Sequence, residues 1–146
     1  MNKILIVAVI AIIVVISVIA LWIFFDDDDL TELNDPSPLG TGNSTVILNG
    51  TFQSLDHHVE GSTLLIKSDD NYILRFEDFE SDTGPDIFIY LSADLNAEDY
   101  IDLGKIKAYK GNINYDVPSD TDFEKYNKVL VWCEPFEVVF GYAELD

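Results

Sequence analysis

The pattern of apolar and polar positions divides the chain into two unlike parts. Residues 4–25 form an apolar run that only Ser17, a mildly polar residue, interrupts. At a rise of about 1.5 Å per residue, such a helix is roughly 33 Å long, enough to cross the hydrocarbon core of a bilayer. After this run, apolar positions come in short stretches separated by turn residues, which is typical of β-strands. The pattern therefore predicts one transmembrane helix followed by an all-β domain.

The flanks of the apolar run predict its orientation. Lys3 precedes it and the four aspartates 26–29 follow it. The positive-inside bias then makes residues 1–25 a single-pass signal-anchor in the cell membrane, with a cytoplasmic N-terminus and an extracytoplasmic C-terminal part. A cleaved secretory signal is the alternative, because residues 18–20 resemble a cleavage site. Residues 21–25 prolong the run beyond a typical signal core, so the retained anchor is favoured.

Residues 26–44 are predicted to be a linker. The segment combines aspartates that repel one another with Pro36, Pro38 and two glycines. These residues disfavour helix and permit turns, so a mobile spacer is expected. Two N-glycosylation acceptor patterns begin at Asn43 and Asn49, and they matter only if the host modifies exported proteins.

Residues 45–146 are predicted to form one antiparallel β-sandwich, or a barrel-like variant of it. No segment after residue 25 has sustained helical periodicity, and the turn residues 69–71 join two strands in a predicted hairpin. The predicted strands, rich in Ile, Val, Phe and Tyr, cover residues 46–48, 51–52, 62–67, 72–76, 86–92, 101–109, 113–117, 129–133 and 137–143.

The strongly negative net charge limits the kinds of partner that this domain can bind. The chain has 27 acidic and 8 basic residues, and Lys3 is the one basic residue before the apolar run, so the remainder carries a net charge of 7 − 27 = −20. Such a surface repels phosphate backbones, which excludes nucleic acid as a partner. A solvated exterior and the capture of cations or basic partners are both compatible with it.

Cys133 is the only cysteine, so the chain can form no internal disulfide. It ends the run 129–133, which is apolar on both faces and therefore typical of a central strand. Strand alternation places Cys133 on the same face as Val129 and Val131. A buried, inert thiol is one interpretation and a redox or ligand role is the other. A reactive cysteine needs an electropositive neighbourhood, for which Lys128 and Arg75 are the candidates.

Other candidate sites have structural alternatives. The acidic segment 77–86 could hold calcium, although it lacks the EF-hand pattern and its carboxylates could simply be solvated. Arg75, the only arginine, is predicted to pair with Glu77 or Asp86. No stand-alone metal site is predicted, because two adjacent histidines and one cysteine lack zinc-ligand spacing. No nucleophilic triad or phosphate-binding loop is recognisable.

The ordered motifs of the domain resemble one family of extracellular domains, the DM-thirteen domain, over residues 48–145. The matching pieces are Gly50-Thr51-Phe52, His58 with Gly61, Leu74-Arg75-Phe76-Glu77-Asp78-Phe79, Gly84-Pro85-Asp86 with Tyr90-Leu91-Ser92, Leu103-Gly104-Lys105-Ile106-Lys107, Lys110-Gly111-Asn112 with Asn114-Tyr115 and Val117-Pro118, and Val131-Trp132-Cys133 with Phe136, Val138, Phe140-Gly141 and Ala143. The family is similar to the haem-binding DOMON sandwiches.

The resemblance implies an electron-transfer or thiol-redox role centred on Cys133, as a free redox thiol or as a ligand to a prosthetic group such as haem. Met1 is the only methionine and precedes the anchor, while His57 and His58 are adjacent. Haem ligation would therefore fall to Cys133 with His58, or to Cys133 alone. An electron donor and acceptor would be separate proteins or small molecules.

The sequence thus predicts a membrane-anchored extracytoplasmic redox domain. The alternative is a cofactor-free cell-surface binding or adhesion module with an acidic, cation-binding surface. A stand-alone enzyme ranks below both, because no catalytic acid–base group is identifiable.

Overall fold

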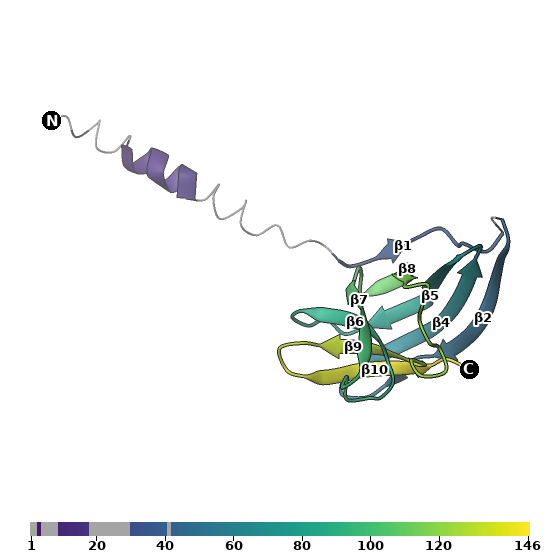
Figure 1. Ribbon diagram of the computed structural model, residues 1–146. Helices are drawn as coiled ribbons and strands as arrows, with labels where there is room; N and C mark the ends of the chain where they lie inside the picture. Colours follow the sequence, from purple (N-terminus) through teal and green to yellow (C-terminus); the bar gives the residue numbers. More distant parts are fainter. Residues whose placement is uncertain (1–2, 4–8, 18–29, 41) are drawn as a thin grey trace.

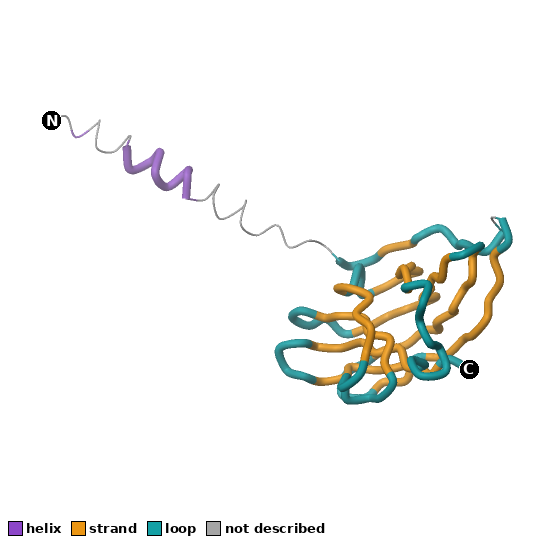
Figure 2. Tube along the Cα trace, in the orientation of Figure 1, coloured by secondary structure: helices purple, strands orange, loops and turns teal. Residues whose placement is uncertain are grey.

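The computed structural model describes residues 3, 9–17, 30–40 and 42–146 (Figures 1 and 2). Residues 9–17 are helical. Within the described ranges, no helix has the length and apolar character needed to cross a membrane. Positions 4–8 and 18–25 of the predicted span lie outside those ranges.

The β-domain consists of two five-stranded sheets (Figure 1). The first sheet has the order β1-β8-β5-β4-β2 and the second has the order β3-β10-β9-β6-β7. All pairings are antiparallel except that of β1 with β8. The strands are β1 (Leu33–Asn34), β2 (Ser44–Thr51), β3 (Gln53–Ser54), β4 (Val59–Ser68), β5 (Asn71–Ser81), β6 (Ile87–Ser92), β7 (Tyr100–Lys105), β8 (Lys110–Val117), β9 (Lys128–Cys133) and β10 (Val138–Glu144).

The predicted sandwich and its hairpin are confirmed. β4 and β5 pair from Ser68 with Asn71 at the turn, where Asp69 has φ 51°. Aspartate tolerates this left-handed conformation better than most residues. The predicted strand 101–109 is confirmed for residues 101–105 and wrong for residues 106–109, because β7 ends at Lys105 and the chain then crosses to β8 in the first sheet. Buried Ile106 and Ala108 keep this crossover apolar, so it reads as a strand.

The prediction that residues 129–133 form a central strand is also confirmed. β9 lies between β10 and β6, and Val129, Val131 and Cys133 are fully buried in the core between the sheets. Leu130 and Trp132 belong to a smaller cluster on the opposite face of the second sheet. Every side chain of β9 after its first residue is therefore buried, as expected for the central strand of the second sheet.

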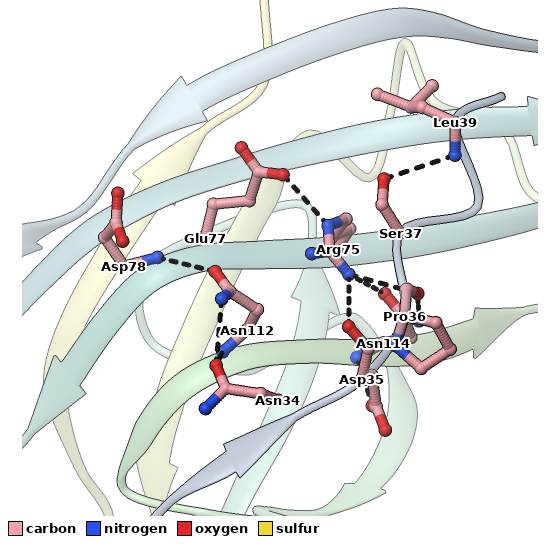
Figure 3. A network of polar contacts seen from close by, with 10 residues as sticks. All are labelled: Asn34, Asp35, Pro36, Ser37, Leu39, Arg75, Glu77, Asp78, Asn112 and Asn114. Atoms are coloured by element: carbon pink, nitrogen blue, oxygen red, sulfur yellow. Dashed lines mark hydrogen bonds and ion pairs between the residues drawn. The ribbon is translucent and has the colours of Figure 1, made fainter.

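The described part of the predicted linker differs from a free spacer. Residues Leu33–Asn34 add β1 to the first sheet beside Gly111 and Asn112. Arg75, only 5% exposed, fixes this segment (Figure 3). Its Nε donates to Glu77 at 2.9 Å, and its Nη1 donates to the Asp35 carbonyl at 3.2 Å. The predicted pairing of Arg75 with a carboxylate is thus confirmed for Glu77.

Gly111 permits the close approach of β1. Its φ is 116°, a backbone conformation that residues other than glycine rarely adopt. A Cβ at this position would also collide with the carbonyl group of Leu33. The docking of residues 30–36 therefore depends on a glycine and an arginine that are distant from them in sequence.

We expect Arg75→Gln to release β1 while the rest of the sandwich stays folded. The substitution removes a charge-assisted bond to Glu77 and the bonds to the 35–36 carbonyls, each worth about 1.5–3 kcal/mol when charged groups are involved. Hydrogen exchange of the Asp35 amide, which donates to the Asn112 carbonyl at 2.7 Å, should accelerate at least about tenfold.

Lys67→Gln is the matched control, since Lys67 lies in the same sheet and its Nζ lies 5.9 Å from the centre of the Tyr72 ring, away from residues 35–36. If hydrogen exchange of the Asp35 amide accelerated equally in both variants, Arg75 would not be what holds residues 35–36 to the first sheet.

Candidate functional site

Cys133 ends β9 in the interior of the sandwich. In register it lies between Ile87 of β6 and Val138 of β10. Its side chain is completely buried, and its Sγ donates to the Pro85 carbonyl at 3.4 Å. The single thiol is therefore a satisfied core group whose polar contact is with one loop, residues 82–86.

The 82–86 loop covers the end of β9 and is held by several independent contacts. The Tyr109 hydroxyl donates to the Gly84 carbonyl at 2.8 Å. The Glu134 amide donates to the Asp86 carbonyl at 3.1 Å, and Lys105 pairs with the Asp86 carboxylate at 2.6 Å. These contacts come from three segments of the chain, and together they hold the loop in place beside the thiol.

Gly84 lets this loop lie flat on the core. A Cβ added there would come within 2.8 Å of the Phe140 ring and 3.0 Å of Ile87 Cδ1. Such distances are shorter than van der Waals contact, so a larger residue would lift the loop from Phe140. The Gly84-Pro85 pair thus supplies both the close packing and the acceptor for the Cys133 thiol.

The two histidines lie at the same end of the sandwich but do not reach Cys133 together. The His57 ring packs on Phe140 with centroids 3.9 Å apart, and its Nδ1 is 3.5 Å from Asp82. The His58 side chain is 48% exposed and its Nε2 is 3.7 Å from Glu60. Because buried Val59 separates His58 from Glu60 in sequence, the two polar side chains share the outward direction.

The positive charges proposed for Cys133 are also elsewhere. Lys128 begins the strand that Cys133 ends, which separates the two residues by about 17 Å along β9. Lys128 contacts Asn127 and Glu144 instead. Arg75 belongs to the first sheet, where it binds residues 35–36. The electropositive neighbourhood that activates a cysteine is therefore not built by either residue.

These positions do not fit haem held by Cys133 and His58. Axial ligation requires the sulfur and the imidazole nitrogen to face the plane of the macrocycle. Here the sulfur is enclosed by core side chains and the imidazole points to solvent beside Glu60. Two surface hollows of the domain are lined by Trp132 and Glu137, and Cys133 lines neither of them.

The calcium hypothesis for residues 77–86 finds no support in the geometry. Glu77, Glu80 and Asp86 pair separately with Arg75, Lys110 and Lys105. In the parts of the chain that the structure describes, no group of three acidic, histidine or cysteine side chains is arranged to hold a metal ion. Half of the predicted loop is strand β5, which points successive carboxylates to opposite faces.

Sequence reasoning did not assign a role to Pro85 or Tyr109, the two residues that enclose and tie the site. The Gly84-Pro85 dipeptide signalled a turn, but a turn signal does not say which side chain the turn covers. Tyr109 lies in the misread strand 101–109, so its hydroxyl had no predicted partner.

The fold and site define a class of protein: a two-sheet β-sandwich with one buried cysteine at the end of a central strand. The family model Electron transfer DM13 matches residues 51–145. The chain therefore belongs to this family, which confirms the resemblance seen in the sequence and makes the domain electron-transfer related. Comparisons with curated proteins and with solved structures gave no match.

We expect Cys133→Ser to fold and to lose about 1–2 kcal/mol of the free energy of unfolding, because a hydroxyl is costlier to bury than a thiol. The same variant tests the haem geometry. Haem added to the full chain in maltoside micelles should give identical visible spectra for Cys133→Ser and the unsubstituted protein. A haem absorption band that shifts or disappears in Cys133→Ser would contradict the structure-based exclusion.

Proposed function

We propose that this protein is a membrane-anchored extracytoplasmic electron-transfer domain whose redox group is the Cys133 thiol. The observation that carries this proposal is the position of the one sulfur, which lies a single loop beneath the surface at the end of the sandwich. The match to the electron-transfer family supports the redox class. Haem is left out of the proposal because the ligand geometry does not accommodate it.

The chemistry that a lone thiol supports is exchange with a disulfide supplied from outside the chain. Cys133 Sγ attacks a partner disulfide R–S–S–R′, forms the Cys133–S–S–R bond and releases R′–S⁻. The proton that leaves the Cys133 thiol passes to R′–S⁻, which departs as R′–SH. The Cys133 sulfur is thereby oxidised by one electron equivalent and the R′ sulfur is reduced by one. A second external thiol R″–SH then attacks the mixed disulfide, forms R–S–S–R″ and returns Cys133 to the thiol.

Access to the sulfur requires displacement of the 82–86 loop. The 82–86 loop is held by hydrogen bonds with His58, Tyr109, Cys133 and Glu134, by the exposed ion pair of Lys105 with Asp86, and by the contact of His57 with Asp82. A neutral hydrogen bond contributes about 0.5–1.5 kcal/mol and an exposed pair less than about 1 kcal/mol. Because opening the loop leaves the pairing and core of both sheets intact, it costs less free energy than unfolding the two sheets.

A pair of matched tyrosine variants tests this route. Tyr109→Phe removes the bond to Gly84, whereas Tyr115→Phe removes a bond from the Lys107 amide elsewhere in the core. We expect an aromatic disulfide to react with native Cys133 about fivefold faster in Tyr109→Phe, since about 1 kcal/mol of closure is lost. Tyr115→Phe should accelerate the reaction by less than twofold.

The free energy of unfolding of both variants serves as the reference for these rates. If the two rates rise in proportion to the loss of global stability, the thiol is reached only in the unfolded chain and the redox proposal fails. A stable mixed disulfide on the folded protein that dithiothreitol removes would support it.

A cofactor-free binding module is the second candidate, and the complete burial of Cys133 favours it. In that case Cys133 serves the core alone. Partner binding would then survive Cys133→Ser, and the native thiol would resist disulfides in both tyrosine variants.

The proposed anchor rests on the apolar run 4–25 between Lys3 and the aspartates 26–29. We expect the full chain to stay with membranes after alkaline carbonate extraction. Placing lysine at both Ile12 and Ile16 should shift it to the supernatant, because each charge near the helix centre costs about 2.5–3.5 kcal/mol. Retention of the double variant, or release of the unsubstituted chain, would contradict the anchor.

A further inference from the structure

The outer face of the second sheet carries a row of aromatic rings, directed away from Cys133. We call this surface the outer aromatic face and define it by Phe88, Tyr90, Tyr100 and Trp132. The Tyr90 and Tyr100 rings are stacked with centroids 4.0 Å apart, and Tyr90 lies 6.2 Å from Trp132. Tyr90 and Trp132 are only 3% and 9% exposed, whereas Tyr100 is 41% exposed, so Tyr100 is the ring of this face that is most open to solvent.

Two shallow hollows flank Trp132 on this face. They have volumes of about 350 Å³ and 120 Å³, and Glu137 lines both. The residues of the larger hollow are Leu55, Asp56, Leu95, Asn96, Trp132, Glu137, Val138 and Val139. Those of the smaller one are Tyr90, Ala97, Tyr100, Trp132, Glu134 and Glu137. The lining thus combines aromatic and aliphatic surface with carboxylates and contains no basic side chain.

The carboxylates of the hollows retain acceptor capacity. Glu134 Oε2 accepts the Tyr90 hydroxyl at 2.7 Å, which fixes the carboxylate at the rim of the smaller hollow. Burial, and then this hydrogen bond, raise the pKa of the Tyr90 phenol above its ordinary value, so Tyr90 remains the donor. Among the described residues, Glu134 Oε1 and the Glu137 carboxylate have no hydrogen-bond or ion-pair partner.

The domain has no basic side chain to spare for these carboxylates. Six of its seven basic residues make hydrogen bonds or ion pairs with groups other than Glu134 and Glu137, and Lys67 lies over the Tyr72 ring. The six are Arg75, Lys105, Lys107, Lys110, Lys125 and Lys128. Glu134 and Glu137 are both exposed, so a cation from outside the described chain can reach them.

The wall of the smaller hollow is held in place. In the loop between β6 and β7, the Asp94 carboxylate accepts the amides of Asn96, Glu98 and Asp99. Lys125 pairs with Asp99 at 2.6 Å, and this hydrogen bond lowers the pKa of the Asp99 carboxyl. A preformed wall reduces the entropy lost on binding.

The rim offers exposed apolar surface for a longer ligand. Phe136 is 69% exposed in the turn between β9 and β10, and Leu55 is 50% exposed beside the larger hollow. A central aromatic pocket with an apolar rim and a few charges is the usual composition of a protein-binding surface.

We propose that the outer aromatic face binds a basic segment of a partner protein, in which a lysine or arginine enters the smaller hollow, lays its aliphatic stem on Tyr100 beside the accessible part of Trp132, and directs its cationic head to Glu134 and Glu137. The strongly negative domain attracts such a segment over long range. Aromatic rings and carboxylates together stabilise an alkylammonium or guanidinium group through cation–π and charge-assisted contacts. The site is independent of any redox role of Cys133.

The test uses the fluorescence of Trp132 in the full chain, with Trp22→Phe so that Trp132 is the sole indole. The protein is kept in maltoside micelles, because detergents with quaternary ammonium headgroups would compete. The probe is a blocked Lys-Leu-Lys-Leu-Lys peptide. We expect a saturable fluorescence change, absent with the same peptide acetylated at every Nζ.

Matched charge variants separate the site from the general field of the domain. Glu134→Gln with Glu137→Gln should weaken binding at least tenfold, while Glu60→Gln with Glu124→Gln, which changes the net charge equally, should weaken it less than twofold. Equal effects of the two pairs would overturn the proposal.

A second experiment titrates the protein with butylammonium. If butylammonium saturated the site with the same affinity as the peptide, the ligand would be a small amine, and the assignment to a partner protein would be overturned. Cys133→Ser should bind the peptide unchanged.

Discussion

The burial of β9 on both of its faces is the constraint on which the rest of the domain depends. Its inward side chains complete the core between the two sheets, and its outward side chains support a second cluster with Tyr90 and Val139. A strand with this environment must lie in the middle of its sheet, as β9 does between β10 and β6. Because neighbouring residues of a strand point to opposite faces, the same strand places Cys133 in the core and Trp132 on the outside.

The alternation of side chains made part of this structure predictable. The run 129–133 revealed a central strand and the face of Cys133, and the turn residues 69–71 revealed the β4–β5 hairpin. Alternation does not say which sheet a strand joins. Residues 106–109 therefore looked like a continuation of β7, although they carry the chain from one sheet to the other.

The rest of the site depends on contacts between residues far apart in sequence. Arg75 binds carbonyls at 35–36, some forty residues away, so a segment with the composition of a linker becomes part of the first sheet. Cys133 meets Pro85 across 48 residues. His58 was expected to join Cys133, but the beginning of β4 turns it outward with Glu60. Composition and spacing carry no information about such long-range partners.

Glu134 connects the two surfaces that this domain offers. Its amide donates to the Asp86 carbonyl and so ties the 82–86 loop over the thiol, while its carboxylate accepts the Tyr90 hydroxyl at the rim of a hollow. A ligand changes an equilibrium only by its difference in affinity for the two states. A ligand that contacts only the Glu134 carboxylate therefore leaves access to Cys133 unchanged unless it also displaces the Glu134 backbone. The side-chain torsions of Glu134 let its carboxylate move without its amide, so the two surfaces share a residue without forming one rigid unit.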